Sequence, residues 1–177
     1  QPERSIISAI QSKDIMLHFP YHSFDYFLNL LREAAIDPAV KTIKLTVYRL
    51  AANSIVINTL LNAARNGKAV TVNIELQARF DEEANIKWTQ KLTESGVKVI
   101  DGVPGLKVHS KLLLITRKEK RRLLNIAAVG TGNFNEDSAK VFCDDLLLTT
   151  DKKINNEVVK VFKFLEKNYK RNNYYHL

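Results

Sequence analysis

The sequence contains one cysteine, Cys143, among 177 residues. A single thiol excludes a disulfide framework within the chain and favours a reduced, cytoplasmic setting. No apolar run approaches the ~20 residues that a membrane-spanning helix needs, and the opening QPERSIISAIQSKD holds no apolar signal-peptide block. Internal repeats and low-complexity segments are also absent from the sequence. What remains is a globular chain that is long enough for one domain with a core and too short for two ordinary domains.

Positive charge dominates the ionisable residues. Lysine and arginine total 27 against 19 aspartates and glutamates, for a formal net charge of +8. Such a surplus favours polyanionic partners: nucleic acid, phosphorylated polymers, nucleotides or an anionic membrane surface. Part of the charge lies in TRKEKRRLL, residues 116–124, which is typical of a solvated hairpin turn between two strands. The charge therefore indicates a class of partner and no particular one.

Strand-like and helix-like segments alternate along the chain. Apolar alternation, β-branched runs and helical spacing predict strands at 14–19, 41–50, 69–77, 97–100, 105–115, 123–133 and 141–150, and helices at 23–35, 54–68, 81–96 and 153–172. This order predicts an α/β fold with a mixed, largely parallel sheet flanked by helices on both faces. Cys143 lies in the last predicted strand, so we expect it to be a small buried core residue.

Several polar residues fall where strands end, which is where such sheets bind ligands. Arg49 ends one predicted strand, Arg79 follows the next, and Asn133 and Asn135 follow the segment NIAAVGTG. The stretch GLKVHSKLLLI instead places a histidine and a lysine, two residues apart, at the start of a strand. They reach the same rim only if that strand runs antiparallel, and we predict that it does.

These residue types suit phosphoryl transfer. A neutral histidine ring such as that of His109 is nucleophilic near pH 7, and Lys111 supplies positive charge where negative charge gathers. The glycines of GTGN, residues 130–133, let backbone amides approach an anion, and arginines clamp phosphate oxygens. Taken singly, each of these residues also has an ordinary structural interpretation. Glu75 and Asp144, for example, could be polar groups at strand edges. The combination of these residues in one order along the chain supports the hypothesis of phosphoryl transfer.

HSK followed by GTGN resembles the half-site signature of the phospholipase D superfamily, H-x-K with G-[ST]-x-N. The superfamily also places an aspartate after the lysine, where this chain has Thr116. That departure argues against an ordinary phosphodiesterase. The resemblance implies a phospholipase D-like α/β fold, with a mixed β-sheet flanked by helices on both faces.

A closer resemblance is to polyphosphate kinases of the long bacterial type. The segments that carry it are DIMLHFPYHSFDYF, ELQARFDEEANIKW, GVPGLKVHSKLLLI and GTGNFNEDSAKVFCDDLLLTT. They are similar to the first carboxy-terminal domain of that family. The resemblance implies that residues 1–177 form one phospholipase D-like catalytic half-domain, excised from a longer multidomain chain. The fragment is then expected to fold but to be inactive without its second half-site domain.

The same resemblance assigns roles to individual residues. His109 matches the histidine that becomes phosphorylated, and Lys111, Asn133 and Asn135 match residues of the pocket around the phosphohistidine. Asp144 matches an acidic position expected to orient a histidine ring.

Three further positions concern the nucleotide. Arg49 and Arg79 match arginines at the magnesium–phosphate site, and because arginine has no lone pair for a cation they are expected to hold Mg²⁺ indirectly, through its phosphate oxygens. Phe142 stands where the family usually has a nucleotide-associated tyrosine, so one hydrogen bond worth about 0.5–1.5 kcal/mol is lost while base stacking remains available.

The implied reaction is reversible transfer of the ATP γ-phosphate to inorganic polyphosphate through a phosphohistidine, with Mg²⁺ as cofactor and ATP or ADP as nucleotide. The implied partners are polyphosphate, other domains of the same chain and further copies in a homo-oligomer, with no nucleic acid. The expected location is the cytoplasm, with a peripheral position at the inner membrane left open.

Two alternatives stay open at this point. One is a phospholipase D-like phosphodiesterase or nuclease half-site, in which His109 attacks a phosphodiester and two chains pair. The other is a non-catalytic polyanion-binding module with steeply salt-dependent binding. Within the kinase hypothesis, polymer synthesis and nucleotide rephosphorylation are both compatible with the sequence.

Overall fold

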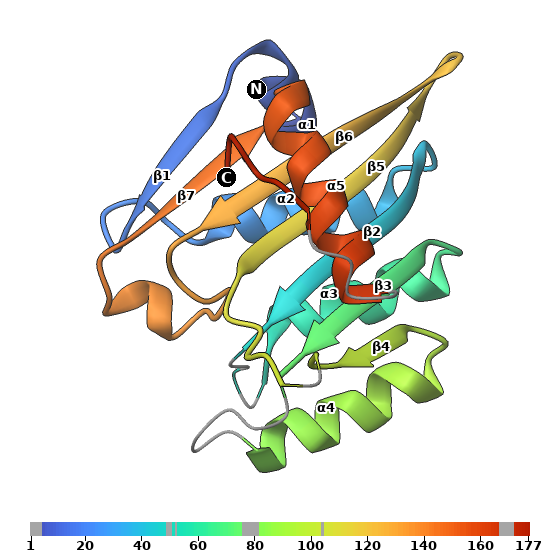
Figure 1. Cartoon of the computed structure of the whole chain (residues 1–177), viewed down its shortest axis with the longest axis vertical. Coiled ribbons are helices and arrows are strands. Elements are labelled where there is room, and N and C mark those ends of the chain that lie inside the picture. The colour runs from blue at the N-terminus through green and yellow to red at the C-terminus, as the bar shows by residue number, and fades with distance from the viewer. Residues whose placement is uncertain (1–4, 49–50, 52, 76–81, 104, 167–171) are drawn as a thin grey trace.

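The protein is built around one seven-stranded sheet (Figure 1). The computed structural model describes residues 5–48, 51, 53–75, 82–103, 105–166 and 172–177. The strands are β1 (Ile15–Phe19), β2 (Val40–Val47), β3 (Ala69–Ile74), β4 (Lys98–Asp101), β5 (Lys111–Glu119), β6 (Arg122–Gly130) and β7 (Asp144–Thr149). The helices are α1 (Ile6–Ser12), α2 (Asp25–Ile36), α3 (Ile55–Arg65), α4 (Glu82–Glu94) and α5 (Lys152–Glu166), with a 3-10 turn η1 (Ser138–Lys140). The strand order across the sheet is β1-β7-β6-β5-β2-β3-β4.

Strand direction changes in the middle of the sheet. The pairs β2–β3 and β3–β4 are parallel, because α3 and α4 cross over between them. The pairs β2–β5, β5–β6, β6–β7 and β1–β7 are antiparallel. The expectation of a largely parallel sheet is therefore wrong, since the hairpin β5–β6 and the returns through β7 and β1 outweigh the crossovers. The prediction that the HSK strand runs antiparallel is confirmed, because β5 pairs with β2 with Leu45 opposite Leu113.

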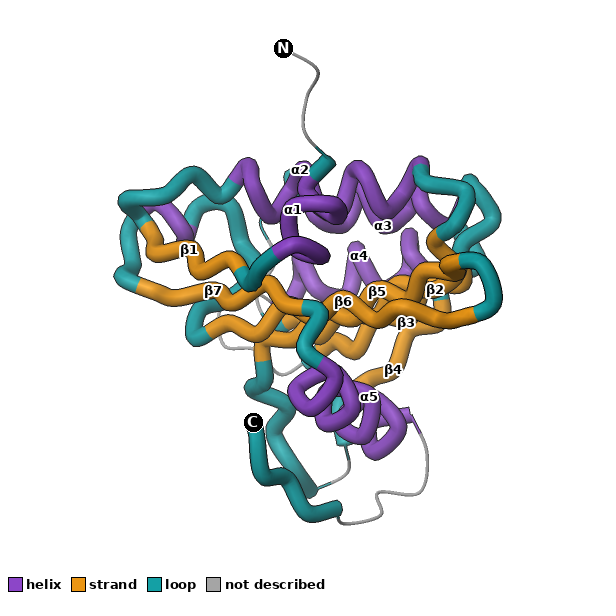
Figure 2. Tube along the Cα trace, turned by 90° about the horizontal axis from the view of Figure 1, so that it is seen from above, coloured by secondary structure: helices purple, strands orange, loops and turns teal. Residues whose placement is uncertain are grey.

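Helices cover both faces of the sheet unequally, as Figure 2 shows: α1 to α4 lie on one face and α5 lies on the other. The larger apolar cluster packs between the first group and the sheet. A smaller cluster joins Val158, Phe162 and Leu165 of α5 to Leu112 and Leu114 of β5. A mixed sheet flanked by helices on both faces is thus the observed architecture. None of the helices in the described ranges is long and apolar enough to cross a membrane.

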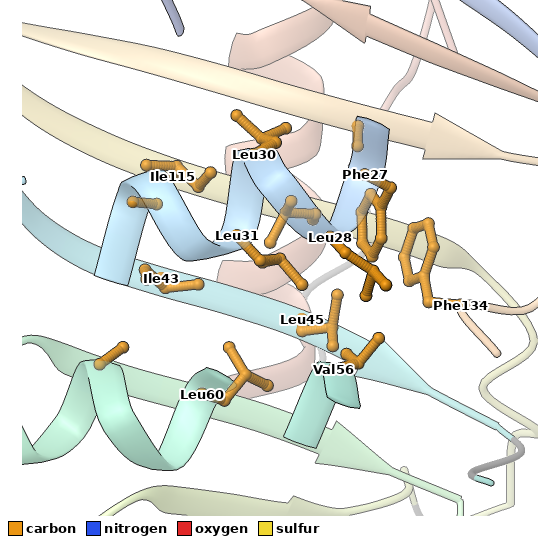
Figure 3. Close-up of a cluster of buried hydrophobic side chains, with 14 of the residues drawn as sticks. Phe27, Leu28, Leu30, Leu31, Ile43, Leu45, Val56, Leu60, Ile115 and Phe134 are labelled. Carbon is orange, nitrogen blue, oxygen red and sulfur yellow. The ribbon is translucent and has the colours of Figure 1, made fainter. Parts of the chain in front are cut away.

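Helix α2 carries the apolar spacing that anchors this core. Phe27 and Leu31 are fully buried and one helical turn apart, so they face the sheet together (Figure 3). The ring of Phe27 stacks on Phe134, with centroids 4.6 Å apart and an interplanar angle of 11°. Phe134 lies in the loop after β6, so the stack fastens that loop to the core.

Local signals in the sequence succeeded for α3 and failed for α1. A helix was predicted over 54–68, and Ser54 caps the observed helix, its side chain accepting a hydrogen bond from the backbone N–H of Ile57. Helix α1 was not predicted, because its seven residues bury only Ile7 and Ile10. Part of its N-terminal cap comes from a distant residue: Glu33 of α2 accepts hydrogen bonds from the backbone N–H groups of Ile6 and Ile7.

The prediction of a buried Cys143 is wrong. The thiol is exposed, because β7 begins only at Asp144 and the preceding residues form η1 and a loop. Asp144 pairs with Phe19, the last residue of β1, so β7 begins at the edge of the sheet where β1 ends.

Two phenylalanines on either side of η1 test how the loop is anchored. Phe134 is 5% exposed and Phe142 is 59% exposed. We expect Phe134→Ala to lower the free energy of unfolding by about 3–5 kcal/mol, because it leaves a cavity beside Phe27. The control Phe142→Ala should change it by less than about 0.5 kcal/mol. Urea unfolding followed by circular dichroism measures both, and equal losses would show that Phe134 does not hold the loop.

Candidate active site

One rim of the sheet gathers the ends of several strands. Strands β2, β3 and β6 end there and β5 and β7 begin there, because β5 and β7 run antiparallel to these neighbours. The register sets Lys111 opposite Gly130, and Gly130 opposite Leu146. The motif HSK and the loop GTGN therefore meet at this rim although they are distant in the sequence.

His109 lies just before β5, in a segment without regular structure. Its side chain is exposed, and its ring meets the ring of Tyr48 edge-on, with centroids 4.9 Å apart and an interplanar angle of 80°. The strand expected from residue 105 begins only at Lys111. The histidine therefore projects from the mouth of the strand instead of forming part of its ladder.

Lys111 is buried although it is charged, with 7% of its surface exposed. Burial lowers the pKa of the Lys111 ammonium, and the nearby carboxylate of Asp144 partly offsets that effect. The ammonium donates a hydrogen bond of 2.5 Å to the backbone oxygen of His109. It also lies 5.7 Å from the ring centroid of Tyr48, and the ammonium of Lys107 lies 5.3 Å from the same centroid. Positive charge thus collects around the ring that contacts His109.

The GTGN loop packs closely against Asp144. A Cβ atom added to Gly132 would lie 2.2 Å from Oδ2 of Asp144, so only glycine leaves room for the carboxylate. The hydroxyl of Thr131 donates to Oδ1 of Asp144 at 2.8 Å. The described partners of Asp144 are thus a hydroxyl and the charge of Lys111, and its expected role in orienting a histidine ring stays a prediction.

The two asparagines of the loop differ in their partners. Oδ1 of Asn135 accepts hydrogen bonds from the backbone N–H groups of Asp137 and Ser138, at 2.9 and 3.0 Å, so Asn135 shapes the turn. Oδ1 of Asn133 is buried without a hydrogen-bond partner. A buried acceptor that lacks a donor is costly, and this unmet oxygen distinguishes Asn133 from Asn135.

Of the three residues expected at the nucleotide, one lies in the described part of the chain. Arg49 and Arg79 lie outside the described residues. Phe142 is exposed in the loop between η1 and β7, directly before the strand that carries Asp144.

Two buried polar residues near His109 were not recognised as site residues from the sequence. Glu75, read there as an edge group, is 7% exposed and accepts a hydrogen bond from the backbone N–H of Val108 at 3.2 Å. Thr46, within β2, donates to the backbone oxygen of Ser110 at 2.6 Å. The signal available in the sequence was a polar residue inside an otherwise apolar strand, which does not reveal its partner.

No group of three or more histidine, cysteine, aspartate or glutamate side chains within the described ranges is placed to hold a metal ion. Magnesium commonly binds through one or two carboxylates together with substrate phosphates. A carboxylate is present at the rim in Asp144, and its Oδ1 accepts a hydrogen bond from Thr131.

The fold is similar to that of a phospholipase D family member. The crystal structure of Nuc from Salmonella typhimurium, a phospholipase D family member, superposes with a TM-score of 0.67 at 16% identity, over 87% of this chain and 93% of that chain. At that identity the likeness concerns the fold alone.

Sequence comparison is more specific. The family described as "Polyphosphate kinase C-terminal domain 1" matches residues 5–171, and this chain belongs to it. The chain is 52% identical to polyphosphate kinase of Escherichia coli K12 over 167 residues, which are 94% of this chain and 24% of that protein. The crystal structure of polyphosphate kinase from Porphyromonas gingivalis superposes with a TM-score of 0.85 at 40% identity, over 98% of this chain and 29% of that chain. The chain thus spans about a quarter of the length of these relatives.

Burial and the charge of Asp144 shift the pKa of Lys111 in opposite directions. Substitutions at the adjacent residues Asp144 and Asp145 can separate the two effects. Because the Asp144 carboxylate favours the charged ammonium, Asp144→Asn should lower the pKa of Lys111 further, so that deprotonation begins at lower pH. Asp145→Asn is the matched control, since Asp145 instead pairs with His18 at 2.7 Å. A titration of the lysine ¹³Cε resonance measures the shift, and an identical titration in all three proteins would contradict the coupling.

Proposed function

We propose that this domain provides the phosphoryl-accepting histidine of a polyphosphate kinase. The observation that supports it is the exposed side chain of His109, whose backbone oxygen accepts a hydrogen bond from the ammonium of buried Lys111, at the strand-end rim of a domain of that family. The proposed reaction is reversible transfer of the ATP γ-phosphate to inorganic polyphosphate.

The reaction is a pair of displacements. A neutral ring nitrogen of His109 attacks the γ-phosphorus, the bond from phosphorus to the bridging oxygen breaks, and ADP leaves with that electron pair. The terminal oxygen of a polyphosphate chain then attacks the phosphohistidine, the N–P bond breaks, and the chain is one phosphate longer. The two displacements are similar in kind, so the reaction can run in either direction.

The rim residues would mainly position and neutralise charge, as phosphoryl transfer requires. Lys111 supplies positive charge next to the nucleophile, in a dry setting that strengthens its effect. The amide of Asn133, turned so that its N–H₂ faces the ligand, would donate to a phosphoryl oxygen. Asp144 would hold the histidine ring in the attacking orientation.

The nucleotide would approach the same rim. Arg49 and Arg79 would clamp phosphate oxygens, and the exposed ring of Phe142 would stack on the base. Mg²⁺ would arrive bound to the phosphates of ATP and neutralise part of their charge.

Residues 1–177 would act as one catalytic half-domain of a longer chain. We infer that a second half-site in another domain completes the pocket and that the isolated fragment is inactive. Homo-oligomerisation and a cytoplasmic location, with or without peripheral contact to the inner membrane, belong to the same proposal.

The test restores the flanking domains and incubates the protein with γ-labelled ATP and Mg²⁺. We expect an acid-labile, base-stable phosphoryl adduct that His109→Ala abolishes. The control His18→Ala removes another exposed histidine and should retain the adduct.

An adduct that survives His109→Ala would place the nucleophile elsewhere. If no adduct forms, hydrolysis of a phosphodiester without metal would favour the diesterase half-site. Salt-dependent polyanion binding that His109→Ala leaves unchanged would favour the binding module.

A further inference from the structure

The segment that carries His109 lies outside the sheet ladder, so its backbone groups need other partners. The segment 107–110 has no regular structure, and β5 begins at Lys111. Buried backbone groups that lack a ladder partner are normally bound by side chains or water. Here three consecutive residues, 108, 109 and 110, each have one backbone group bound by a side chain from a different strand or strand end.

On the amino-terminal side of His109, the contact comes from the end of β3. Glu75 directly follows that strand, and its Oε2 accepts the backbone N–H of Val108 at 3.2 Å. Glu75 and Val108 are both 7% exposed, so the carboxylate binds this amide in a largely dry environment, where hydrogen bonds are electrostatically stronger.

On the carboxy-terminal side, the contact comes from β2. The hydroxyl of Thr46 donates to the backbone oxygen of Ser110 at 2.6 Å and accepts from the backbone N–H of Leu112 at 2.9 Å. The pairing of β2 with β5 has its last registered pair at Leu45 and Leu113. Thr46 therefore extends the connection between the two strands by side chain where the backbone ladder stops.

We propose that Thr46 and Glu75 form a backbone clamp that positions His109 for phosphoryl transfer. The proposal rests on the proposed function of His109. Both residues act through the backbone on either side of the nucleophile, Glu75 at Val108 and Thr46 at Ser110. The ring of His109 meets that of Tyr48 at the rim, and the position from which the ring projects is set by the backbone that carries it. A displacement of about 1 Å in a reacting group can reduce the rate about 100-fold.

Paired substitutions separate positioning from folding. In the protein restored to full length, Thr46→Val and Glu75→Leu remove the clamping oxygens with little change in shape. Thr46→Ser and Glu75→Gln keep an oxygen at each position. The measurements are the single-turnover rate of His109 phosphorylation per folded molecule, the Kd for ATP, the thermal midpoint, and hydrogen exchange at the amides of Val108 and Leu112.

We expect Thr46→Val and Glu75→Leu to slow phosphorylation about 10- to 100-fold, with the Kd for ATP unchanged within about threefold. Exchange at Val108 should accelerate in Glu75→Leu, and exchange at Leu112 in Thr46→Val. Thr46→Ser and Glu75→Gln should restore the rate to within about threefold of wild type. A lower thermal midpoint with a normal rate per folded molecule would overturn the clamp, since the two residues would then serve stability alone.

The exchange data keep this proposal separate from the proposed function. If wild type forms no adduct on His109, the function fails, and the clamp as a holder of the segment is judged by exchange alone. Local acceleration at Val108 and Leu112 would then support it. Unchanged exchange in both Thr46→Val and Glu75→Leu would overturn it.

Discussion

The antiparallel ladder between β2 and β5 is the constraint on which the arrangement of the rim depends. β2 also pairs in parallel with β3, so the carboxyl ends of these two strands lie beside the start of β5. On its other side, β5 pairs with β6 and sets Lys111 opposite Gly130, which opens the GTGN loop. One change of strand direction thus brings a histidine, a buried lysine and a glycine loop to a single edge. If β5 ran parallel, HSK would lie at the opposite end of the sheet.

Burying polar groups at this edge has a cost that their partners partly offset. A buried ammonium is unfavourable without partners, and the carboxylate of Asp144 together with the carbonyl of His109 provides them for Lys111. Thr46 and Glu75 are buried for a related reason, because backbone groups of the loop bind them. The rim therefore combines a buried floor with an exposed imidazole, an arrangement that fits the proposed acceptance and release of a phosphoryl group. Phe134 ties the neighbouring loop to the same core through Phe27.

Features set by local sequence could be predicted, and features set by distant partners could not. The cap of α3 follows from Ser54 itself, and the direction of β5 followed from the need of His109 and Lys111 to reach the other strand ends. Helix α1 depends on Glu33, which is 27 residues from Ile6 along the chain. The late start of β7, which exposes Cys143, depends on where β1 ends. In the site itself, the motifs predict His109 and Lys111 as reacting groups, and those roles stay predictions. The contacts of Thr46 and Glu75 with the segment 107–110 depend on residues far apart in the chain and leave no signal in the sequence.

The central claim is that one histidine carries the phosphoryl group in both directions of transfer. The most direct test charges the full-length protein once with ATP and once with polyphosphate, and maps the phosphorylated peptide by mass spectrometry under conditions that preserve phosphohistidine. The account predicts that both donors label His109, in the peptide that contains GLKVHSK. Labelling of different residues by the two donors, or of any residue other than His109, would contradict it.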